Sequence, residues 1–359
     1  MPIGYLFTTL LVAWGTFFAV AARRPRRSRP SSLSFWFGFL LNELPFLAFF
    51  WLLASTVIAF GQGDLNTRIG RVGLGIALIT TVGLLVIVLR SLRTRPAVEV
   101  AMADGLGIRP QIRLPWTRIV LFPFPLRPRT VERIADLAYG DLGRPNLLDV
   151  YRRRDRPTGC PTLIHFHGGA FRGGRKSREA RPLLYRLARR GWVCVSANYR
   201  LAGEGSYPDP LADARGVIAW VRRHADEYGV DPDAVFVAGS SAGGHQAAMC
   251  ALTGEPVAAA ISLYGYYGTV GGGDPSTSPH AYVKADAPPF FVAHGDRDTV
   301  VVVDDARRFV ADLRGVSTRP VVYAELPGAH HTFDVFHSIR LESVIAGIEA
   351  FAAAIRNYY

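Results

Sequence analysis

The sequence predicts an α/β domain with a mostly parallel sheet flanked by helices, preceded by three transmembrane helices. From residue 131 onward, short apolar strands alternate with helical patterns, and glycines or other turn residues separate them. Before residue 95, three long apolar runs contain few charges. We therefore expect a membrane domain at 1–95, a connector that is a possible lid at 96–130, and a catalytic domain at 131–359.

The first apolar run, at 3–22, has 20 residues and would measure about 30 Å as a helix, which matches a bilayer core. No basic residue precedes it and five arginines follow it, which is the wrong polarity for a secretory signal peptide. The second and third spans are expected at about 38–60 and 72–89. Glu43 is either a functional group inside the membrane or, as we favour, a helix-end residue beside the kinking Pro45.

The net charge of +12 is concentrated near the apolar runs. Residues 1–130 hold 15 arginines against 4 acids, whereas residues 131–359 hold 26 basic residues against 25 acids. Arginines beside membrane spans set orientation, so we expect no nucleic-acid partner. The bias predicts a multi-pass protein of the cell membrane with an outside amino terminus and a cytoplasmic catalytic domain. The three cysteines are too few and too scattered for a disulfide framework or a zinc site.

The catalytic domain divides into regular elements in chain order. The connector before it is rich in Pro and Arg and carries Trp116, Phe122 and Phe124. Its apolar residues follow neither a helical nor a strand period. Strands are expected at 131–139, 147–151, 162–166, 192–199, 234–240, 257–264, 289–295 and 320–326. Helices are expected at 181–190, 213–228, 242–252, 304–314 and 341–355.

The motif GSSAGG places a candidate nucleophile at Ser241. It follows the strand AVFVA and opens the helix AGGHQAAMCAL, as a sharp strand-to-helix turn requires. Gly239 and Gly243 leave room around such a turn, where the serine adopts an unfavourable backbone conformation. We therefore expect Ser241 to project at the carboxyl end of the sheet.

A serine hydroxyl needs a base, and the base needs a carboxylate to orient it. His331 follows the last predicted strand and is the favoured base; the adjacent His330 is its rival. Asp298 lies just past the strand PFFVAHG and is the favoured carboxylate. Asp296 is its rival, although aspartate in that position often shapes a turn. The chain order Ser, Asp, His is the order of one common triad scaffold.

The motif HGGAF predicts the donors for an oxyanion. Its small residues follow the strand TLIHF, and their backbone N–H groups can face a substrate directly. We expect the N–H groups of Gly169, Ala170 and Ala242 to form the oxyanion hole, where each donor contributes about 3 kcal/mol. No metal-ligand spacing and no phosphate-binding loop is present in the sequence, and the chemistry needs neither metal nor cofactor.

These motifs resemble the hormone-sensitive-lipase-like branch of the α/β-hydrolases and the neighbouring feruloyl-esterase-like group, over about 130–357. The segment NYRLAGEGSYPDPLADA is also similar to the family segment that leads to the nucleophile. Ala170 stands where the family has a glycine. Only 57 residues separate Ser241 from Asp298, too few for a large lid between them. The preceding spans resemble membrane-anchored actinobacterial esterases.

The sequence thus predicts a membrane-anchored serine carboxylic-ester hydrolase that forms an acyl-enzyme on Ser241. Short- to medium-chain acyl esters, as small molecules or lipids, are the expected substrates, and the bilayer is the expected partner. Two alternatives remain open at this stage: an acyltransferase that uses the same acyl-enzyme, and a catalytically silent membrane scaffold. The sequence carries no indication of oligomeric state.

Overall fold

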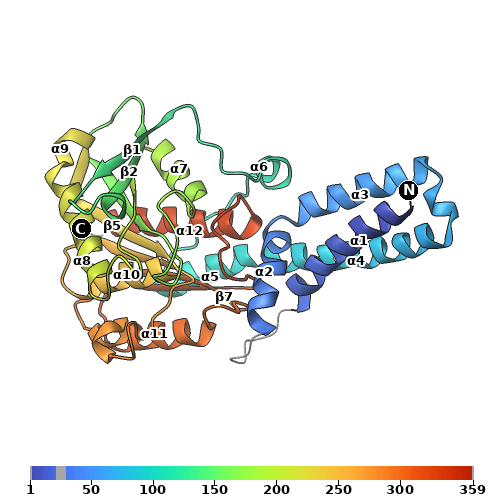
Figure 1. Cartoon of the computed structure of the whole chain (residues 1–359). Coiled ribbons are helices and arrows are strands. Elements are labelled where there is room, and N and C mark those ends of the chain that lie inside the picture. Colours follow the sequence, from blue (N-terminus) through green and yellow to red (C-terminus); the bar gives the residue numbers. More distant parts are fainter. Residues whose placement is uncertain (1, 22–29, 358–359) are drawn as a thin grey trace.

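The computed structural model describes residues 2–21 and 30–357, and it has two parts (Figure 1). One part is a bundle of long apolar helices, and the other is an α/β domain in which a twisted sheet lies between two layers of helices. The bundle projects from one end of the α/β domain, and the amino terminus lies at its far tip (Figure 1). The arginines at 23–29, on which the predicted orientation largely depends, lie outside the described residues.

The bundle differs from prediction in one helix. Its elements are α1 (Pro2–Ala21), α2 (Pro30–Glu43), α3 (Pro45–Gly61), a 3-10 turn η1 (Asp64–Asn66) and α4 (Arg68–Leu92). The segment predicted as one span at 38–60 is broken at Leu44, where α2 and α3 meet at 88°. Pro45 begins α3 because a proline lacks the N–H that a continuous helix would need there. Glu43 lies at the end of α2, which is the location that we favoured.

Two helices of the described residues, Pro2–Ala21 and Arg68–Leu106, are long and apolar enough to cross a membrane. The bent pair Phe35–Glu43 and Pro45–Gly61 provides a third crossing if the two helices form one broken span. With 17 residues, α3 alone is about 26 Å long, slightly shorter than a bilayer core.

The first part of the expected connector is helical. Helix α5 (Thr94–Leu106) continues α4, and together they form a helix of 39 residues. Val98 and Met102 are fully buried on the face that α5 packs against the edge strand of the sheet and the last helix. Gly105 lets α5 approach closely, since a Cβ there would lie 2.8 Å from the Val321 carbonyl oxygen. This part of the chain therefore belongs to the domain core and does not cover the site.

The predicted sheet is confirmed, with eight strands that match the expected segments closely. The strands are β1 (Val131–Ala138), β2 (Leu147–Arg153), β3 (Cys160–Phe166), β4 (Val193–Ala197), β5 (Val230–Ser240), β6 (Ala259–Leu263), β7 (Phe290–Gly295) and β8 (Val321–Leu326). Their order is β1-β2-β4-β3-β5-β6-β7-β8, in which β2 is antiparallel to both neighbours and all later pairs are parallel. The strands β3 to β8 therefore end at one edge, where the predicted motifs meet.

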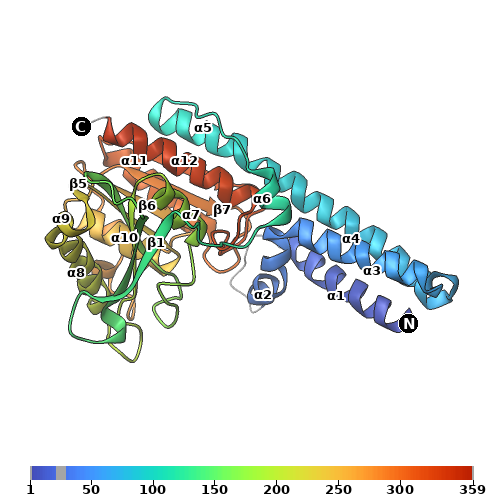
Figure 2. The same ribbon diagram turned by 90° about the horizontal axis from the view of Figure 1, so that it is seen from above.

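Helices cover both faces of the sheet, because the inner strands are apolar on both sides. One face carries α8 (Asp209–Arg223), α10 (Ala242–Leu252) and α11 (Val303–Val316). The other carries α5, α7 (Arg181–Arg189) and α12 (Ile339–Arg356), and Figure 2 shows α5 lying along α12. Two hydrophobic cores result, one on each side of the sheet.

A buried ion pair joins the bundle to the catalytic domain. Arg340 donates to Glu43 Oε1 at 3.1 Å and to the Asn42 carbonyl at 2.7 Å, and both charged side chains are almost fully buried. Ser338 Oγ donates to Glu43 Oε2 at 2.6 Å. Asn42 and Arg340 also both donate to the Gly328 carbonyl, at 3.2 and 3.1 Å. The α2–α3 corner is thereby attached to the loop that follows β8.

We expect Glu43→Ala to destabilise the chain by about 3–5 kcal/mol, because it leaves the Arg340 guanidinium buried without its carboxylate. Chemical denaturation of the detergent-solubilised full chain would measure the change. Glu99→Ala is the matched control, since Glu99 pairs with the half-exposed Arg95 on the surface of α5 and should cost less than about 1 kcal/mol. Equal effects of the two substitutions would contradict the assignment of a structural role to the buried pair.

Candidate active site

Ser241 lies at the sharp turn between β5 and α10. Its φ of 56° and ψ of −117° are unfavourable for a side-chain-bearing residue. The glycines around it permit the turn: a Cβ on Gly239 would lie 1.9 Å from the Gly243 carbonyl oxygen, and one on Gly243 would lie 1.9 Å from that of Phe166. The chain thus holds the hydroxyl at the carboxyl edge of the sheet, as the sequence predicts.

The structure brings Ser241, His331 and Asp298 together. His331 Nε2 lies 2.9 Å from Ser241 Oγ, and His331 Nδ1 lies 2.6 Å from Asp298 Oδ2. The two rivals face other groups. His330 Nε2 lies 3.3 Å from the Ala19 carbonyl, and Asp296 Oδ1 accepts the Gly328 N–H at 2.6 Å, where it shapes the turn.

Asp298 is fully buried but remains suited to carry a negative charge. Burial by itself would raise its pKa, yet attraction to His331 and hydrogen bonding with His294 and His331 hold the pKa below its usual range. The other carboxylate oxygen, Oδ1, accepts the N–H groups of Val300 and Val301 at 2.8 and 2.9 Å. These contacts fix the carboxylate, which in turn favours the tautomer of His331 that accepts a proton at Nε2.

The oxyanion loop follows β3 and lies directly beside the nucleophile. A Cβ on Gly168 would lie 3.0 Å from Ser241 Cβ. Gly169 and Ala170 both have positive φ, 124° and 54°, a conformation that glycine adopts readily and that is unfavourable for alanine. Within the described part of the chain, the backbone N–H groups of these two residues donate to no acceptor. The N–H of Ala242, the first residue of α10, lies where a helix has no intrahelical partner for it.

Two buried carboxyl groups behind this loop were not identified from the sequence. Glu179 accepts the Gly168 N–H at 2.5 Å, and Asp334 accepts the hydroxyl groups of Ser240 and Tyr264. Burial raises the pKa of Glu179, and repulsion from Asp334 raises it further. The neutral form is thus favoured near the position where negative charge would develop. Asp334 follows His331 by three residues in HHTFD, and this proximity was the available sequence signal.

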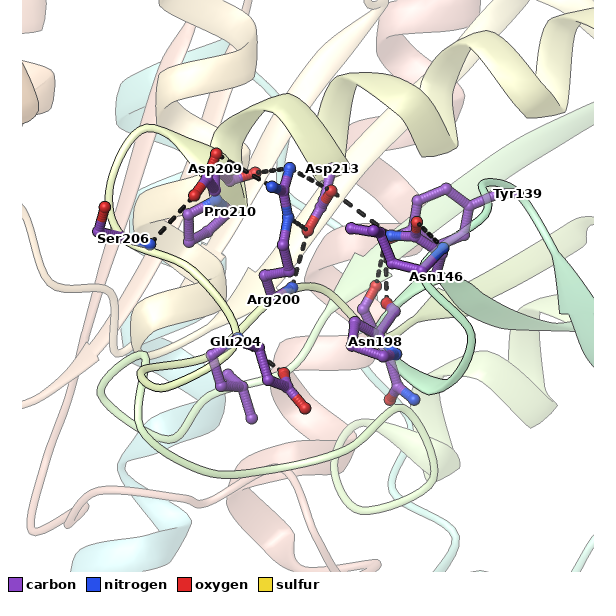
Figure 3. Close-up of polar contacts among 12 residues, drawn as sticks. Tyr139, Asn146, Asn198, Arg200, Glu204, Ser206, Asp209, Pro210 and Asp213 are labelled. Carbon is purple, nitrogen blue, oxygen red and sulfur yellow. Dashed lines mark hydrogen bonds and ion pairs between the residues drawn. The ribbon is translucent and has the colours of Figure 1, made fainter.

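The segment between β4 and α8 is held by one arginine (Figure 3). Arg200 donates to both carboxylate oxygens of Asp213 at 2.9 Å and pairs with Asp209 at 3.0 Å. Asp213 also accepts a hydrogen bond from Asn146 at 3.4 Å, and this contact links the segment to the β1–β2 connection. Farther along, the Ala202 N–H donates to the Phe171 carbonyl at 2.7 Å. Arg200 thus holds the segment whose Ala202 N–H contacts the oxyanion loop.

Three further histidines of the site region, His165, His167 and His245, are neutral near pH 7. Burial lowers the pKa of His165 to about 3, and those of His167 and His245 to about 4. His165 Nε2 lies 3.0 Å from Ser240 Oγ, and His167 stacks on Tyr199. These contacts are those of side chains that brace and pack the site. Among residues 2–21 and 30–357, no group of three or more His, Cys, Asp and Glu side chains is arranged to hold a metal ion.

The strand order, with a serine on a tight turn after β5, defines the class: an α/β-hydrolase fold. Comparison with known proteins specifies the class further. A family model described as BD-FAE matches residues 148–264, and one described as the dienelactone hydrolase family matches residues 211–354.

Similar proteins are ester hydrolases. A probable carboxylic ester hydrolase of Mycobacterium tuberculosis, LipM, is 34% identical over 98% of this chain and 93% of its own length. Esterase LipQ of that organism is 35% identical over 63% of each chain. The structure of Thermogutta terrifontis esterase 2 phosphonylated by cyclosarin is 25% identical, with a TM-score of 0.55 over 62% of this chain and 93% of that chain. This chain belongs to the carboxylic ester hydrolases of the α/β-hydrolase superfamily, in the hormone-sensitive-lipase-like and feruloyl-esterase-like group, and is a carboxylesterase.

Proposed function

We propose that the protein is a membrane-anchored serine esterase in which Ser241, His331 and Asp298 form the catalytic triad. The observation that carries this proposal is the position of His331, within hydrogen-bond distance of Ser241 Oγ on one side and of Asp298 on the other. A histidine in that position can take the serine proton while the carboxylate stabilises the imidazolium that forms. Short- to medium-chain acyl esters are the proposed substrates.

The reaction proceeds in two halves. Ser241 Oγ attacks the ester carbonyl carbon as its proton passes to His331 Nε2, and the bond to the alcohol then breaks as the alcohol takes that proton. The N–H groups of Gly169, Ala170 and Ala242 stabilise the oxyanion in between. Water then attacks the acyl-enzyme and gives a proton to His331. The carboxylic acid leaves, and the proton returns to Ser241.

The apolar exterior of the bundle supports the membrane anchor. Large hydrophobic side chains point outward from each long helix, and Phe7, Trp51 and Ile79 are 68%, 61% and 75% exposed. Such a surface is unfavourable in water but matches lipid. We propose three spans, formed by α1, α3 and α4. Arginines at the end of α4 and beyond it, on the side of the catalytic domain, support a cytoplasmic catalytic domain: Arg90, Arg93, Arg95, Arg109 and Arg113.

A fluorophosphonate probe tests the proposed nucleophile, since phosphonylation has been seen in the Thermogutta terrifontis esterase. Membranes from cells that express the full chain would be washed with carbonate at high pH and divided into two portions, one labelled with the probe and one assayed unlabelled with p-nitrophenyl esters of graded chain length. We expect the labelled band to remain in the washed membranes and the unlabelled portion to hydrolyse the shorter esters. A chain that neither labels nor hydrolyses any ester overturns the triad, and a labelled chain released by the wash overturns the anchor.

A further inference from the structure

The catalytic edge of the sheet faces the helical bundle, and two apolar surfaces lie at that level. From this arrangement we infer that the edge carrying Ser241 rests on the bilayer surface. We further infer that the enzyme takes its ester from that bilayer, as an amphiphile whose apolar portion stays in the lipid. The inference rests on the proposed triad and membrane anchor, and it specifies the substrate class that they serve.

The membrane helices contact the catalytic loops directly. Arg297, next to Asp298, donates to the carbonyl of Val20 at the end of α1 at 2.8 Å. His330, next to His331, lies 3.3 Å from the adjacent carbonyl in α1. The third span has no flexible linker, since α4 continues into α5 on the flank of the domain. If these helices cross a bilayer, its boundary must therefore lie within a few residues of the catalytic loops, and the domain cannot turn its site away.

The first apolar surface is on α2. Because α2 meets α3 at 88°, it runs across the bundle and not along it, which is the orientation of a helix lying in a membrane interface (Figures 1 and 2). Trp36, Phe37 and Leu40 are 63%, 45% and 43% exposed, and we call these three residues the α2 patch. The neighbouring Phe35 ring packs edge-on against the His331 ring, with 6.0 Å between centroids. The α2 patch is thus continuous with the site.

The second apolar surface surrounds α6 (Trp116–Leu121), which packs against α3 at the junction with the catalytic domain (Figures 1 and 2). Five large apolar side chains are between 46% and 77% exposed here, and we call them the α6 patch: Trp116, Leu121, Phe122, Phe124 and Leu126. The surrounding segment 107–130 contains five arginines and no acidic residue. Aromatic side chains mixed with arginines are typical of the boundary between lipid and water, and the arginines favour anionic lipid.

The bilayer fits these surfaces better than a second protein does. Both patches adjoin the helices proposed to span the membrane, so lipid that surrounds those helices would reach the patches without any further association. An ester drawn from that lipid has a short path to the oxyanion loop, where Gly169 and Ala170 are exposed. Its apolar chain can stay against the α2 patch and the bilayer, and it never has to enter water.

The test compares two esters with the full-length enzyme in vesicles of phosphatidylcholine and phosphatidylglycerol. One ester, p-nitrophenyl acetate, is soluble, and the other, p-nitrophenyl decanoate, has a medium-length acyl chain and partitions into the vesicles. The test variant is the triple substitution Trp116→Ser, Phe122→Ser and Phe124→Ser, and we expect its ratio of decanoate to acetate turnover to fall about tenfold or more. The control variant, Val100→Ser with Val316→Ser, removes equally exposed apolar side chains away from the patches and should keep the wild-type ratio.

The outcomes separate this inference from the proposed function. A wild-type enzyme that hydrolyses neither ester overturns the proposed function. If the wild type hydrolyses the acetate but the test and control variants have the same ratio, the triad stands and the bilayer inference fails. The same conclusion follows if the wild type hydrolyses only the soluble ester.

A spectroscopic measurement locates the α6 patch without using activity. The three native cysteines are buried, so a cysteine introduced at an exposed position can be labelled selectively. We expect an environment-sensitive fluorophore on Leu126→Cys to shift to shorter wavelength in vesicles and to be quenched by nitroxide-labelled lipid. The same fluorophore on Val316→Cys, which lies before β8 at the opposite edge of the sheet, should show neither change. An unquenched label at Leu126→Cys overturns the inference.

Discussion

Ser241→Ala is expected to lower kcat for p-nitrophenyl esters by about 10⁵- to 10⁶-fold and to abolish fluorophosphonate labelling. Without the hydroxyl no acyl-enzyme can form, and only the oxyanion hole and substrate binding remain to accelerate attack by water. Steady-state kinetics of the full chain in detergent, with the probe assay alongside, would measure the effect.

Ser240→Ala is the matched control, because Ser240 is the adjacent serine in the same motif. Its hydroxyl faces away from the base and donates to Asp334 at 2.5 Å. We expect this variant to be labelled and to retain most of its activity, with losses limited to those from a disturbed buried hydrogen bond. Activity of Ser241→Ala within tenfold of wild type would show that another residue is the nucleophile.

Asp298→Asn is expected to lower kcat about 10⁴-fold. The amide cannot stabilise an imidazolium, and its N–H₂ group favours the wrong tautomer of His331. The pKa of Asp298 lies below its usual range, so the carboxylate is ionised in wild type throughout the neutral region. The loss should therefore persist at every pH between about 6 and 8. A pH–rate profile of wild type and variant would test this.

The rival aspartate supplies the control for that experiment. Asp296 accepts the Gly328 N–H and holds the turn before the base loop, so Asp296→Asn should reduce activity far less than Asp298→Asn.

The lowered pKa of Asp298 also affects how the stability of the fold depends on pH. A carboxylate with a lowered pKa stabilises the fold above its usual pKa and loses that contribution as the pH falls toward the folded-state pKa. Asp298→Asn should remove this loss of stability at acid pH. In the kinetic comparison, equal losses of activity in Asp298→Asn and Asp296→Asn would contradict the triad assignment.

Much of the catalytic domain could be predicted from local pattern. The segment AVFVA in β5 and the segment FFVA in β7 are continuous apolar runs beside turn residues, and burial on both faces of a parallel sheet produces that pattern. The break at Leu44 was harder to place, because apolar residues lie on both sides of Asn42, Glu43 and Pro45, and this pattern also fits a kink within one span. Helix α5 was missed because its buried face is short, with Val98, Ala101 and Met102, and because the exposed apolar Val100 beside them obscures the helical period.

In the candidate site, too, some residues could be predicted from local pattern and others could not. Ser241 and the oxyanion loop are encoded within single motifs, since their conformation requires glycine or small residues at fixed spacings. The choice between His330 and His331 is not encoded in this way, because both follow the same strand and differ only in the direction of the side chain. Glu179 and Asp334 lie far apart in sequence, and only folding brings them behind one loop.

The sequence by itself therefore determined the fold class, the order of the candidate catalytic residues and the presence of an apolar amino-terminal domain. Those properties depend on local backbone conformation and on periodic burial, which neighbouring residues specify. Only the tertiary structure decided how the two parts meet. It placed Asn42 of the bundle on Gly328, before His331, and Glu43 on Arg340, after His331, and it turned the catalytic edge toward the helices. Such contacts join residues almost three hundred positions apart, and no local pattern records them.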